Sequence, residues 1–277
     1  MMKKLIFILA LPISLLQSCE DVPEFGENET VPVIEAFIYA NQPVQNIIIK
    51  EVQPFGATEG TEVFLTGLQP QILRNENAFE LTESEGNPGH YFYSGTDLII
   101  EIGETYEFSV DFGSVQVTGE TTVPSPPIGL TMVTDTLEVP AIEERRDLIR
   151  FFQSGDNQLL VEWENLGGAY HYILIRNVEE NPLPLDPNEL IPFNFNFTSE
   201  PTQDDFFNLS AFAHFTQFGS HQLILFRVNP EYALLYESLE QDSRDLNEPF
   251  SNITNGVGVF SAFSSDTVNF EILQRPD

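Results

Sequence analysis

A period of two between apolar and polar residues runs through much of this chain, and it constrains the fold more than any other feature. In the clearest segment, residues 106–112, tyrosine, phenylalanine and valine alternate with glutamate, serine and aspartate. Such alternation is typical of a strand with one buried face. Gly113-Ser114 follows as a two-residue turn, and Val115 and Val117 continue the pattern. The segment therefore predicts a β-hairpin, because glycine supplies the backbone angles that a tight turn needs.

Comparable segments predict short strands along the rest of the chain. They are Val33–Tyr39, Ile47–Val52, Val63–Thr66, His90–Ser94, Leu98–Glu101, Leu148–Phe152, Leu159–Trp163, Tyr170–Val178, Gln222–Val228, Val257–Phe263 and Val268–Leu273. Leu148–Phe152 and Leu159–Trp163 are expected to form a hairpin around the turn Ser154–Asn157. Many short strands separated by turn residues are typical of β-sandwiches. We therefore expect an all-β protein.

The sequence divides at Pro124-Ser125-Pro126-Pro127, which interrupts the strand pattern. We expect residues 30–124 to form one β-sandwich domain and residues 125–277 a second. In the second, a strand ending in Trp163 is followed by a turn and a tyrosine-rich strand, which resembles the centre of an immunoglobulin or fibronectin type III-like sandwich. The prediction is thus two tandem sandwiches.

One helix is expected, over residues 230–241. Pro230 suits the first helical position, and Asn229 can cap it. An apolar stripe at helical spacing follows, formed by Tyr232, Leu235, Tyr236 and Leu239. We expect this stripe to pack on the second sandwich.

Residues 181–218 form an insert that is too long for a simple connection between strands. It is rich in phenylalanine, and its candidate ligand contacts are Phe193, Phe195, Phe197, Phe206 and Phe207. One interpretation is an aromatic-lined binding insert. The other is a satellite core that covers one edge of a sheet, and we favour it because phenylalanine is more often buried than exposed.

The N-terminus carries an export signal. Lys3 and Lys4 precede an apolar run of 12 residues, Leu5–Leu16, which is too short for a bilayer that needs about 20 residues. Residues 1–18 are therefore expected to be a cleaved signal peptide. The run ends in Leu16-Gln17-Ser18-Cys19, which resembles the bacterial lipobox. Leucine and a small residue there precede the cysteine that becomes acylated.

Cys19 is the only cysteine of the chain, so it cannot form an internal disulfide. We expect it to be lipidated and to anchor the protein stably, since two or more acyl chains hold a protein on a membrane. The acidic residues 19–29 are expected to be a flexible tether. Acidic residues behind the lipidated cysteine also resemble the signal that sends Bacteroidetes lipoproteins to the cell surface. The expected location is the outer membrane, exposed on the surface, with the periplasmic face as the alternative.

Charge and motifs exclude several functions. The formal net charge of −32 repels nucleic acid and anionic lipid, while 42% hydrophobic residues exclude a disordered acidic chain. No nucleophile elbow, phosphate loop, zinc-protease helix or calcium loop occurs in the sequence. The four histidines lack metal-ligand spacing. We therefore expect no enzyme activity, no cofactor and no metal site.

The C-terminal third carries a family resemblance. Asn247-Glu248-Pro249-Phe250, Ser251-Asn252-Ile253 and the stretch Asn255–Phe263 resemble motifs of a Bacteroidetes lipoprotein family, domain-of-unknown-function family 4249. Glu248, Val257 and Ser261 depart from the family pattern. Upstream, Val33–Ile38, Gly103–Tyr106 and Thr122–Pro124 are similar to its other elements, so the likeness covers essentially the whole chain after the signal peptide.

The resemblance implies a role beside a TonB-dependent outer-membrane transporter, in nutrient uptake, and it brings no catalytic residues. In physical terms Asn255-Gly256 predicts a tight turn, and Gly258 predicts a close approach of two backbones. Two alternatives remain open. One is an adhesin or fimbrial-type structural subunit, which tandem sandwiches on a lipid tether would suit. The other is a carbohydrate-binding or carbohydrate-degrading protein.

Overall fold

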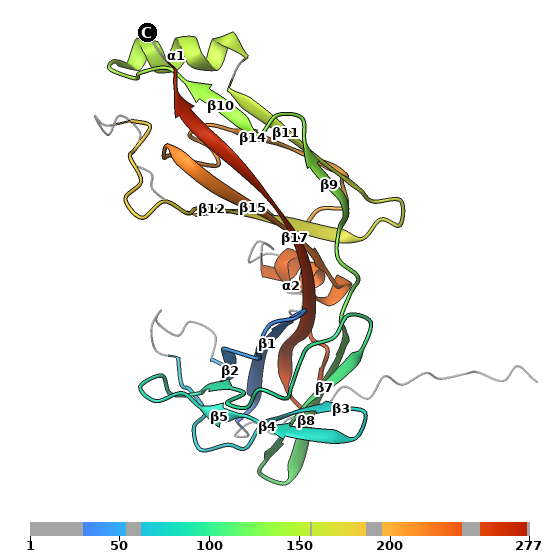
Figure 1. Cartoon of the computed structure of the whole chain (residues 1–277). Coiled ribbons are helices and arrows are strands. Elements are labelled where there is room, and N and C mark those ends of the chain that lie inside the picture. Colours follow the sequence, from blue (N-terminus) through green and yellow to red (C-terminus); the bar gives the residue numbers. More distant parts are fainter. Residues whose placement is uncertain (1–29, 54–61, 156, 187–195, 240–249, 276–277) are drawn as a thin grey trace, which may run out of the picture.

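The computed structural model describes residues 30–53, 62–155, 157–186, 196–239 and 250–275. Half of the structure is strand and 9% is helix, so the prediction of an all-β protein is confirmed. The strands form two lobes, one above the other in Figure 1, which are joined by a long strand that runs through both.

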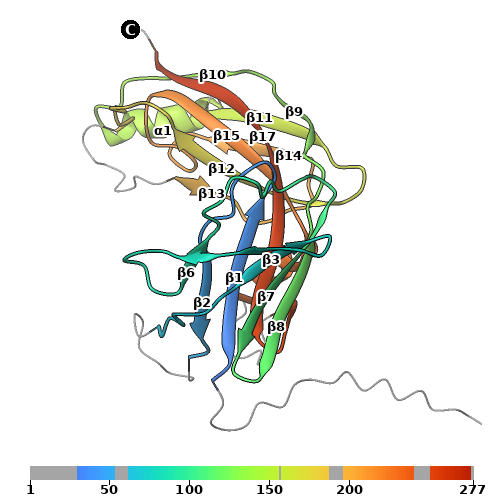
Figure 2. The same ribbon diagram turned by 60° about the horizontal axis from the view of Figure 1, so that its bottom comes forward.

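The lower lobe is a sandwich of two sheets (Figure 2). Its strands are β1 (Pro32–Tyr39), β2 (Ile47–Glu51), β3 (Gln71–Arg74), β4 (Asn77–Glu80), β5 (Thr82–Glu83), β6 (His90–Phe92), β7 (Thr105–Phe112), β8 (Val115–Thr122), β16 (Ile253–Thr254) and the first part of β17 (Val257–Gln274). The sheet β16-β8-β7-β3-β4 packs on β17-β1-β2-β6-β5. Ile34, Ile38, Tyr106, Phe108 and Phe260 are fully buried between them. The predicted hairpin is confirmed, because β7 and β8 pair from Thr105 to Phe112.

The upper lobe contains a three-stranded sheet, the remaining part of the nine-stranded sheet that also runs through the lower lobe, and the first helix. Its elements are β9 (Ile128–Met132), β10 (Thr136–Val139), α1 (Arg145–Ser154), β11 (Gln158–Glu164), β12 (Tyr170–Asn177), β13 (Phe197–Thr198), β14 (Phe206–Ser210), β15 (Gly219–Val228) and the second part of β17. The sheet β14-β11-β9 packs on β13-β12-β15-β17. Leu159, Trp163, Ile173, Leu225 and Phe270 are buried between them. The second helix, α2 (Pro230–Leu239), lies at the waist between the lobes (Figure 1).

Strand β17 is the common element of both lobes. Residues 257–263 pair in parallel with β1, and residues 263–272 pair antiparallel with β15. The prediction of two separate strands, Val257–Phe263 and Val268–Leu273, is wrong at the gap. Residues 264–267 contain no glycine or proline, and β15 supplies a backbone partner for each of them. The chain passes from one lobe to the other near Pro124, but residues 253–263 return to the first lobe.

An aromatic junction fills one side of the waist. We use this name for Phe37, Tyr39, Tyr172, Phe226, Tyr232 and Phe263. Tyr39 stacks on Phe263 with ring centroids 5.0 Å apart, and Tyr172 stacks on Phe226 at 4.7 Å. Such pairs add about 0.5–1.5 kcal/mol each beyond the area they bury. The junction therefore joins side chains of β1, β12, β15, β17 and α2 into one cluster.

The apolar stripe of helix α2 was predicted to pack on the second sandwich. Tyr232 of this stripe contacts Tyr172 of the upper lobe at 5.7 Å, and it also contacts Phe37 of the lower lobe at 5.8 Å. Asn229 was predicted to cap the helix. Its side-chain amide instead donates to Thr121 Oγ1 and to the Thr122 carbonyl, at 3.0 and 2.8 Å. The start of the helix is thus tied to β8.

The predicted strand Leu148–Phe152 is wrong, because these residues lie in α1. Glu144 and Asp147 form a reciprocal capping box at its start, and Gly155 ends it in the left-handed conformation with φ of 77°. These two signals define helix ends. Phe151 is the one buried residue of the helix. Gly155, which was expected to lie in a hairpin turn, is therefore the C-cap of the helix.

Two further predicted strands, Val63–Thr66 and Leu98–Glu101, are also wrong. Only Phe64 of the first makes a bridge, to Lys50. Beside the second, the Tyr106 hydroxyl donates to the Ile99 carbonyl at 2.9 Å and accepts from the Glu101 amide at 2.8 Å. A side chain thus takes the place of a strand partner for this backbone.

We predict that Phe263→Ala destabilises both lobes together. Phe263 is 1% exposed and sits where the β1 and β15 ladders meet. Truncating a buried phenylalanine costs about 3–5 kcal/mol. Chemical denaturation measures this loss. Phe206→Ala is the matched control, since Phe206 is 48% exposed and surface changes stay within about 0.5 kcal/mol. Equal losses in the two variants would contradict the assigned role.

Gly258→Ala should prevent normal folding. Gly258 has φ of 110°, and a Cβ added there would collide with the Ile34 carbonyl of β1, as the sequence led us to expect. Both effects act on the parallel ladder between β1 and β17. Circular dichroism and soluble yield would detect the defect, and Gly155→Ala, where a Cβ meets nothing within 4 Å, is the control for positive φ alone. A Gly258→Ala protein as stable as Gly155→Ala would refute the close-approach argument.

Candidate functional site

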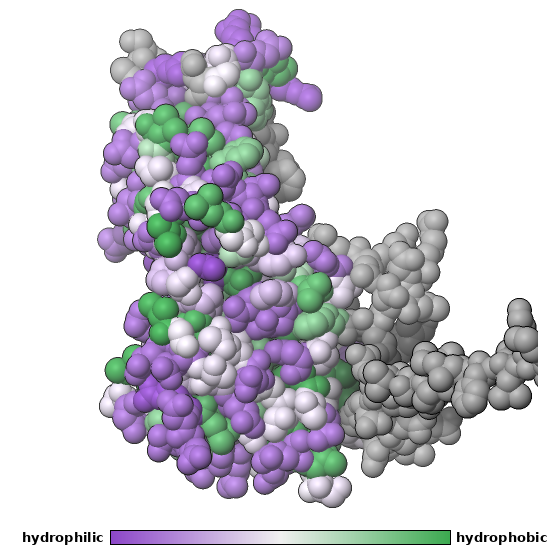
Figure 3. Space-filling view, turned by 90° about the vertical axis from the view of Figure 1, so that its right-hand side faces the viewer, coloured by the Kyte–Doolittle hydropathy of each residue, from purple (hydrophilic) through white to green (hydrophobic). Residues whose placement is uncertain are grey.

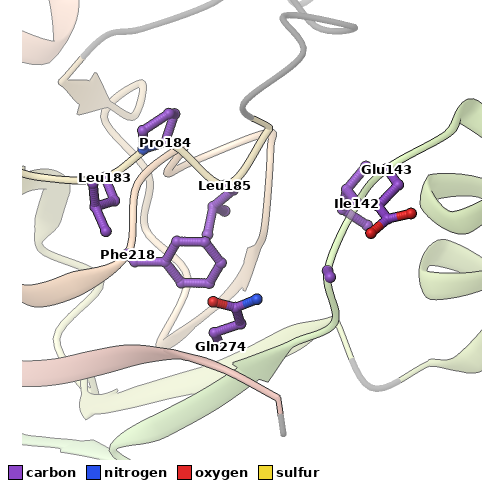
Figure 4. Close-up of a pocket in the computed structure, with 8 residues that line it drawn as sticks. Ile142, Glu143, Leu183, Pro184, Leu185, Phe218 and Gln274 are labelled. Carbon is purple, nitrogen blue, oxygen red and sulfur yellow. The ribbon is translucent and has the colours of Figure 1, made fainter. Parts of the chain in front are cut away.

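A cavity of about 350 Å³ lies at the end of the upper lobe, beside the last residues of β17 (Figure 4). We call it the distal cavity. It is lined by Ala141, Ile142, Glu143, Leu183, Pro184, Leu185, Phe218 and Gln274. These residues come from four separate parts of the chain, which the fold brings together at one end of the upper lobe.

One wall is a proline-interrupted segment that pairs with the residues before β15. The Leu185 amide donates to the Thr216 carbonyl and the Phe218 amide to the Leu183 carbonyl, each at 2.8 Å. Pro184 between them lies opposite Gln217 at the position that makes no hydrogen bond across the pair, so its missing N–H costs this pairing nothing. Leu185 is buried at 1% exposure, whereas Leu183 is 69% exposed at the rim. The wall is therefore apolar from base to rim.

The opposite wall connects β10 to α1. Ile142 is buried at 2% exposure, and Glu143 next to it is exposed. Gln274, the last residue of β17, lies between the walls in Figure 4. Its position is fixed because Val139 of β10 pairs with it and accepts a hydrogen bond from the Arg275 amide at 2.8 Å. The cavity thus has apolar walls, one amide and one carboxylate.

This set of side chains suits binding rather than chemistry. The lining holds no histidine, serine, threonine, cysteine or lysine, so it offers no nucleophile with an adjacent base. Among the described residues, no group of three or more histidine, cysteine, aspartate and glutamate side chains is placed to hold a metal ion. An apolar pocket with a few polar groups is the usual form of a small-molecule site.

The predicted aromatic contacts of the insert fall into three groups. Phe197 and Phe207 are half-buried against the core of the upper lobe, and both pack on His214, with ring centroids 4.4 and 5.2 Å away. Phe206 points to solvent. Phe193 and Phe195 lie outside the described residues. For Phe197 and Phe207 the arrangement is that of a satellite core.

The lipobox residues Leu16, Gln17 and Ser18, the lipidation residue Cys19 and the tether 19–29 also lie outside the described residues. None of the described helices has the length and hydropathy to cross a membrane. On the face shown in Figure 3, small apolar patches are interspersed with polar surface.

Three histidines are built into the upper lobe. His171 packs against Trp163, and His221 stacks on Phe270 with centroids 5.1 Å apart. Burial lowers the pKa of His171 to about 4 and lowers the pKa values of His214 and His221. The neutral His171 ring donates from Nδ1 to the Ala169 carbonyl at 3.1 Å. These rings serve as packed, uncharged side chains at neutral pH.

Comparison of the sequence with protein-family models and with curated proteins finds no match. The distal cavity was not predicted from the sequence. Its residues are scattered over 134 positions, and the one local signal is the run Asn181-Pro182-Leu183-Pro184-Leu185, where prolines leave two leucines without a regular strand.

We predict that acid destabilises the upper lobe through its histidines. Because the folded pKa of His171 is about 4 and an unfolded histidine titrates near 6.5, the unfolded state binds more protons between these values. The free energy of unfolding should therefore fall as the pH drops from about 6.5 to 4, by about 3 kcal/mol for His171 alone.

His171→Gln removes this titration and should flatten the slope of stability against pH. Fluorescence of Trp163, the only tryptophan, follows the unfolding in both proteins. Carboxylate titration is common to both, so it cancels in the difference between them. Identical slopes for the two proteins would show that His171 does not titrate in this range.

Proposed function

We propose that this protein is a bacterial lipoprotein, anchored through acylated Cys19 in the outer membrane, whose folded part binds a partner or ligand without catalysis. The observation that carries the proposal is the sequence Leu16-Gln17-Ser18-Cys19 directly behind a basic and apolar signal. Cys19 is the only cysteine of the chain, so it cannot form an internal disulfide, and acylation is the modification that the lipobox predicts for it.

The fold supports this arrangement. The tether of residues 19–29 leads to the start of β1, which pairs with the start of β17. The distal cavity lies at the other end of β17, 18 residues further along. At about 3.3 Å per strand residue the two ends are on the order of 50 Å apart. An anchor at one end therefore leaves the cavity directed away from the anchoring bilayer.

We also propose that the lobes are immunoglobulin or fibronectin type III-like sandwiches. The hydrogen bonds from Tyr106 back to the backbone of residues 99–101 favour this. They have the form of the tyrosine corner, in which a tyrosine at the start of a strand binds backbone a few residues upstream. Trp163, 4% exposed in the core of the second lobe, is consistent with the same fold.

Membership of family 4249 and a place beside a TonB-dependent transporter are part of the same proposal. Among the described residues of the resemblance, Asn252 and Asn255 make structural hydrogen bonds. The Asn252 side chain donates to the Phe260 carbonyl at 2.8 Å and accepts from the Phe260 amide at 2.9 Å. Asn255 donates to the Gln116 carbonyl at 2.9 Å. These hydrogen bonds hold β16 and β17 against β8, so we expect binding to take place at other surfaces of the protein.

Metabolic labelling with palmitate, followed by membrane fractionation, tests the anchor. The wild-type protein should be labelled and recovered with the outer membrane, and Cys19→Ala should be neither. Gln17→Ala, a change two residues away, should retain both properties. Labelling of Cys19→Ala, or an unlabelled wild-type protein, would overturn the anchoring proposal.

Cross-linking in living cells tests the partnership. A transporter of the TonB-dependent class should be captured by the wild-type protein and lost when Cys19→Ala releases the chain from the membrane. Capture of other copies of this chain alone would favour the fimbrial alternative and reject the transporter.

A further inference from the structure

We propose that the distal cavity binds a small apolar molecule that is uncharged or cationic. The proposal deepens the binding function proposed above by naming a ligand class. It rests on the proposed binding function, but it does not require the lipid anchor.

The volume sets the size of the occupant. About 350 Å³ is at the lower end of the range of small-molecule sites, about 300–1,000 Å³. An α-helix with its side chains is about 10 Å across, which is too wide for this space. The cavity therefore fits a molecule of about one to three rings or a short branched chain.

The walls set its polarity. Six of the eight lining residues are apolar: Ala141, Ile142, Leu183, Pro184, Leu185 and Phe218. Figure 4 shows the Phe218 ring between the two leucines on one side and Gln274 below. Leu183 is 69% exposed, so an apolar ligand would remove its side chain from water, which is favourable. A sugar would find partners for only part of its hydroxyl groups on these side chains, and hydroxyl groups left unpaired are costly.

The two polar residues of the lining and the charge of the whole chain determine which charge a ligand can carry. The Gln274 amide can donate and accept, whereas the Glu143 carboxylate only accepts. The Gln274 amide can therefore bind a donor or an acceptor of a ligand. The surrounding chain has a net charge of −32, which repels an anion approaching the cavity. Anionic ligands are thus disfavoured both at the rim and at long range.

A matched pair of fluorescent probes tests the class of ligand. N-phenyl-1-naphthylamine is an uncharged, two-ring-system amine, and 1-anilinonaphthalene-8-sulfonate has the same skeleton with a sulfonate added. The protein used is the chain from residue 19 onward with Cys19→Ser, which retains every residue that the structure describes. The uncharged probe should bind saturably to one site and at least about tenfold more tightly than the sulfonate.

Variants locate the site. Leu183→Asp should weaken binding of the uncharged probe about tenfold or more, because it places a charge on the apolar rim. Leu166→Asp is the matched control, since Leu166 is 102% exposed and lies before the start of β12, away from the cavity; it should leave binding unchanged. Ala141→Trp, a second variant at the exposed rim, should fill the space and reduce binding by a similar factor.

Several results would overturn the proposal. They are no saturable binding, equal loss in Leu183→Asp and Leu166→Asp, equal or tighter binding of the sulfonate probe, and displacement of the probe by glucose or maltose. Should Leu183→Asp not fold, as judged by Trp163 fluorescence, Ala141→Trp decides alone. A negative result leaves palmitate labelling of Cys19 unaffected, and an unlabelled Cys19 would leave probe binding unaffected, so the two proposals fail separately.

Discussion

The backbone hydrogen-bond ladder along β17 is the interaction on which the rest of the structure depends. Its first part completes the lower lobe through β1, and its second part completes the upper lobe through β15. The C-terminal strand thus closes a sheet that begins with the first strand of the chain. The lower lobe needs residues 257–263 and the upper lobe needs residues 263–272, so both lobes depend on the same strand.

The aromatic junction and the buried histidines follow from that constraint. Where two sandwiches share a strand, one face at the waist has no opposing sheet, and rings from five elements cover it instead. Burial in this cluster raises the pKa values of Tyr39, Tyr172 and Tyr232 above their usual range. In the upper core, burial keeps His171 and His221 neutral. Ionisable side chains are used in both places as uncharged packing groups.

Particular residues show how far the sequence could predict this fold. The period-two segment Thr105–Phe112 was identified because a half-buried strand leaves a local pattern. Tyr170–Asn177 was identified although both of its faces are buried, because aromatic and β-branched residues favour strands. Leu148–Phe152 was misassigned because its apolar residues also fit a short strand, although Glu144, Asp147 and Gly155 carried the helix signals. Strand β14 was missed within the insert, since its position at the edge of the sheet, beside β11, depends on distant residues. The distal cavity was missed for the same reason.

The parallel pairing of β1 with β17 has a mechanical consequence. The first residue of β1 and the last residue of β17 lie at opposite ends of this pair of strands. A tension applied between these two residues therefore slides the strands along each other. Seven residue pairs, from Val33 with Val257 to Tyr39 with Phe263, would then carry the load together. A ladder pulled lengthwise must break all of its bonds at once, whereas one peeled sideways opens them in turn. The topology therefore loads this ladder in shear, which is the geometry that resists stretching along the strands.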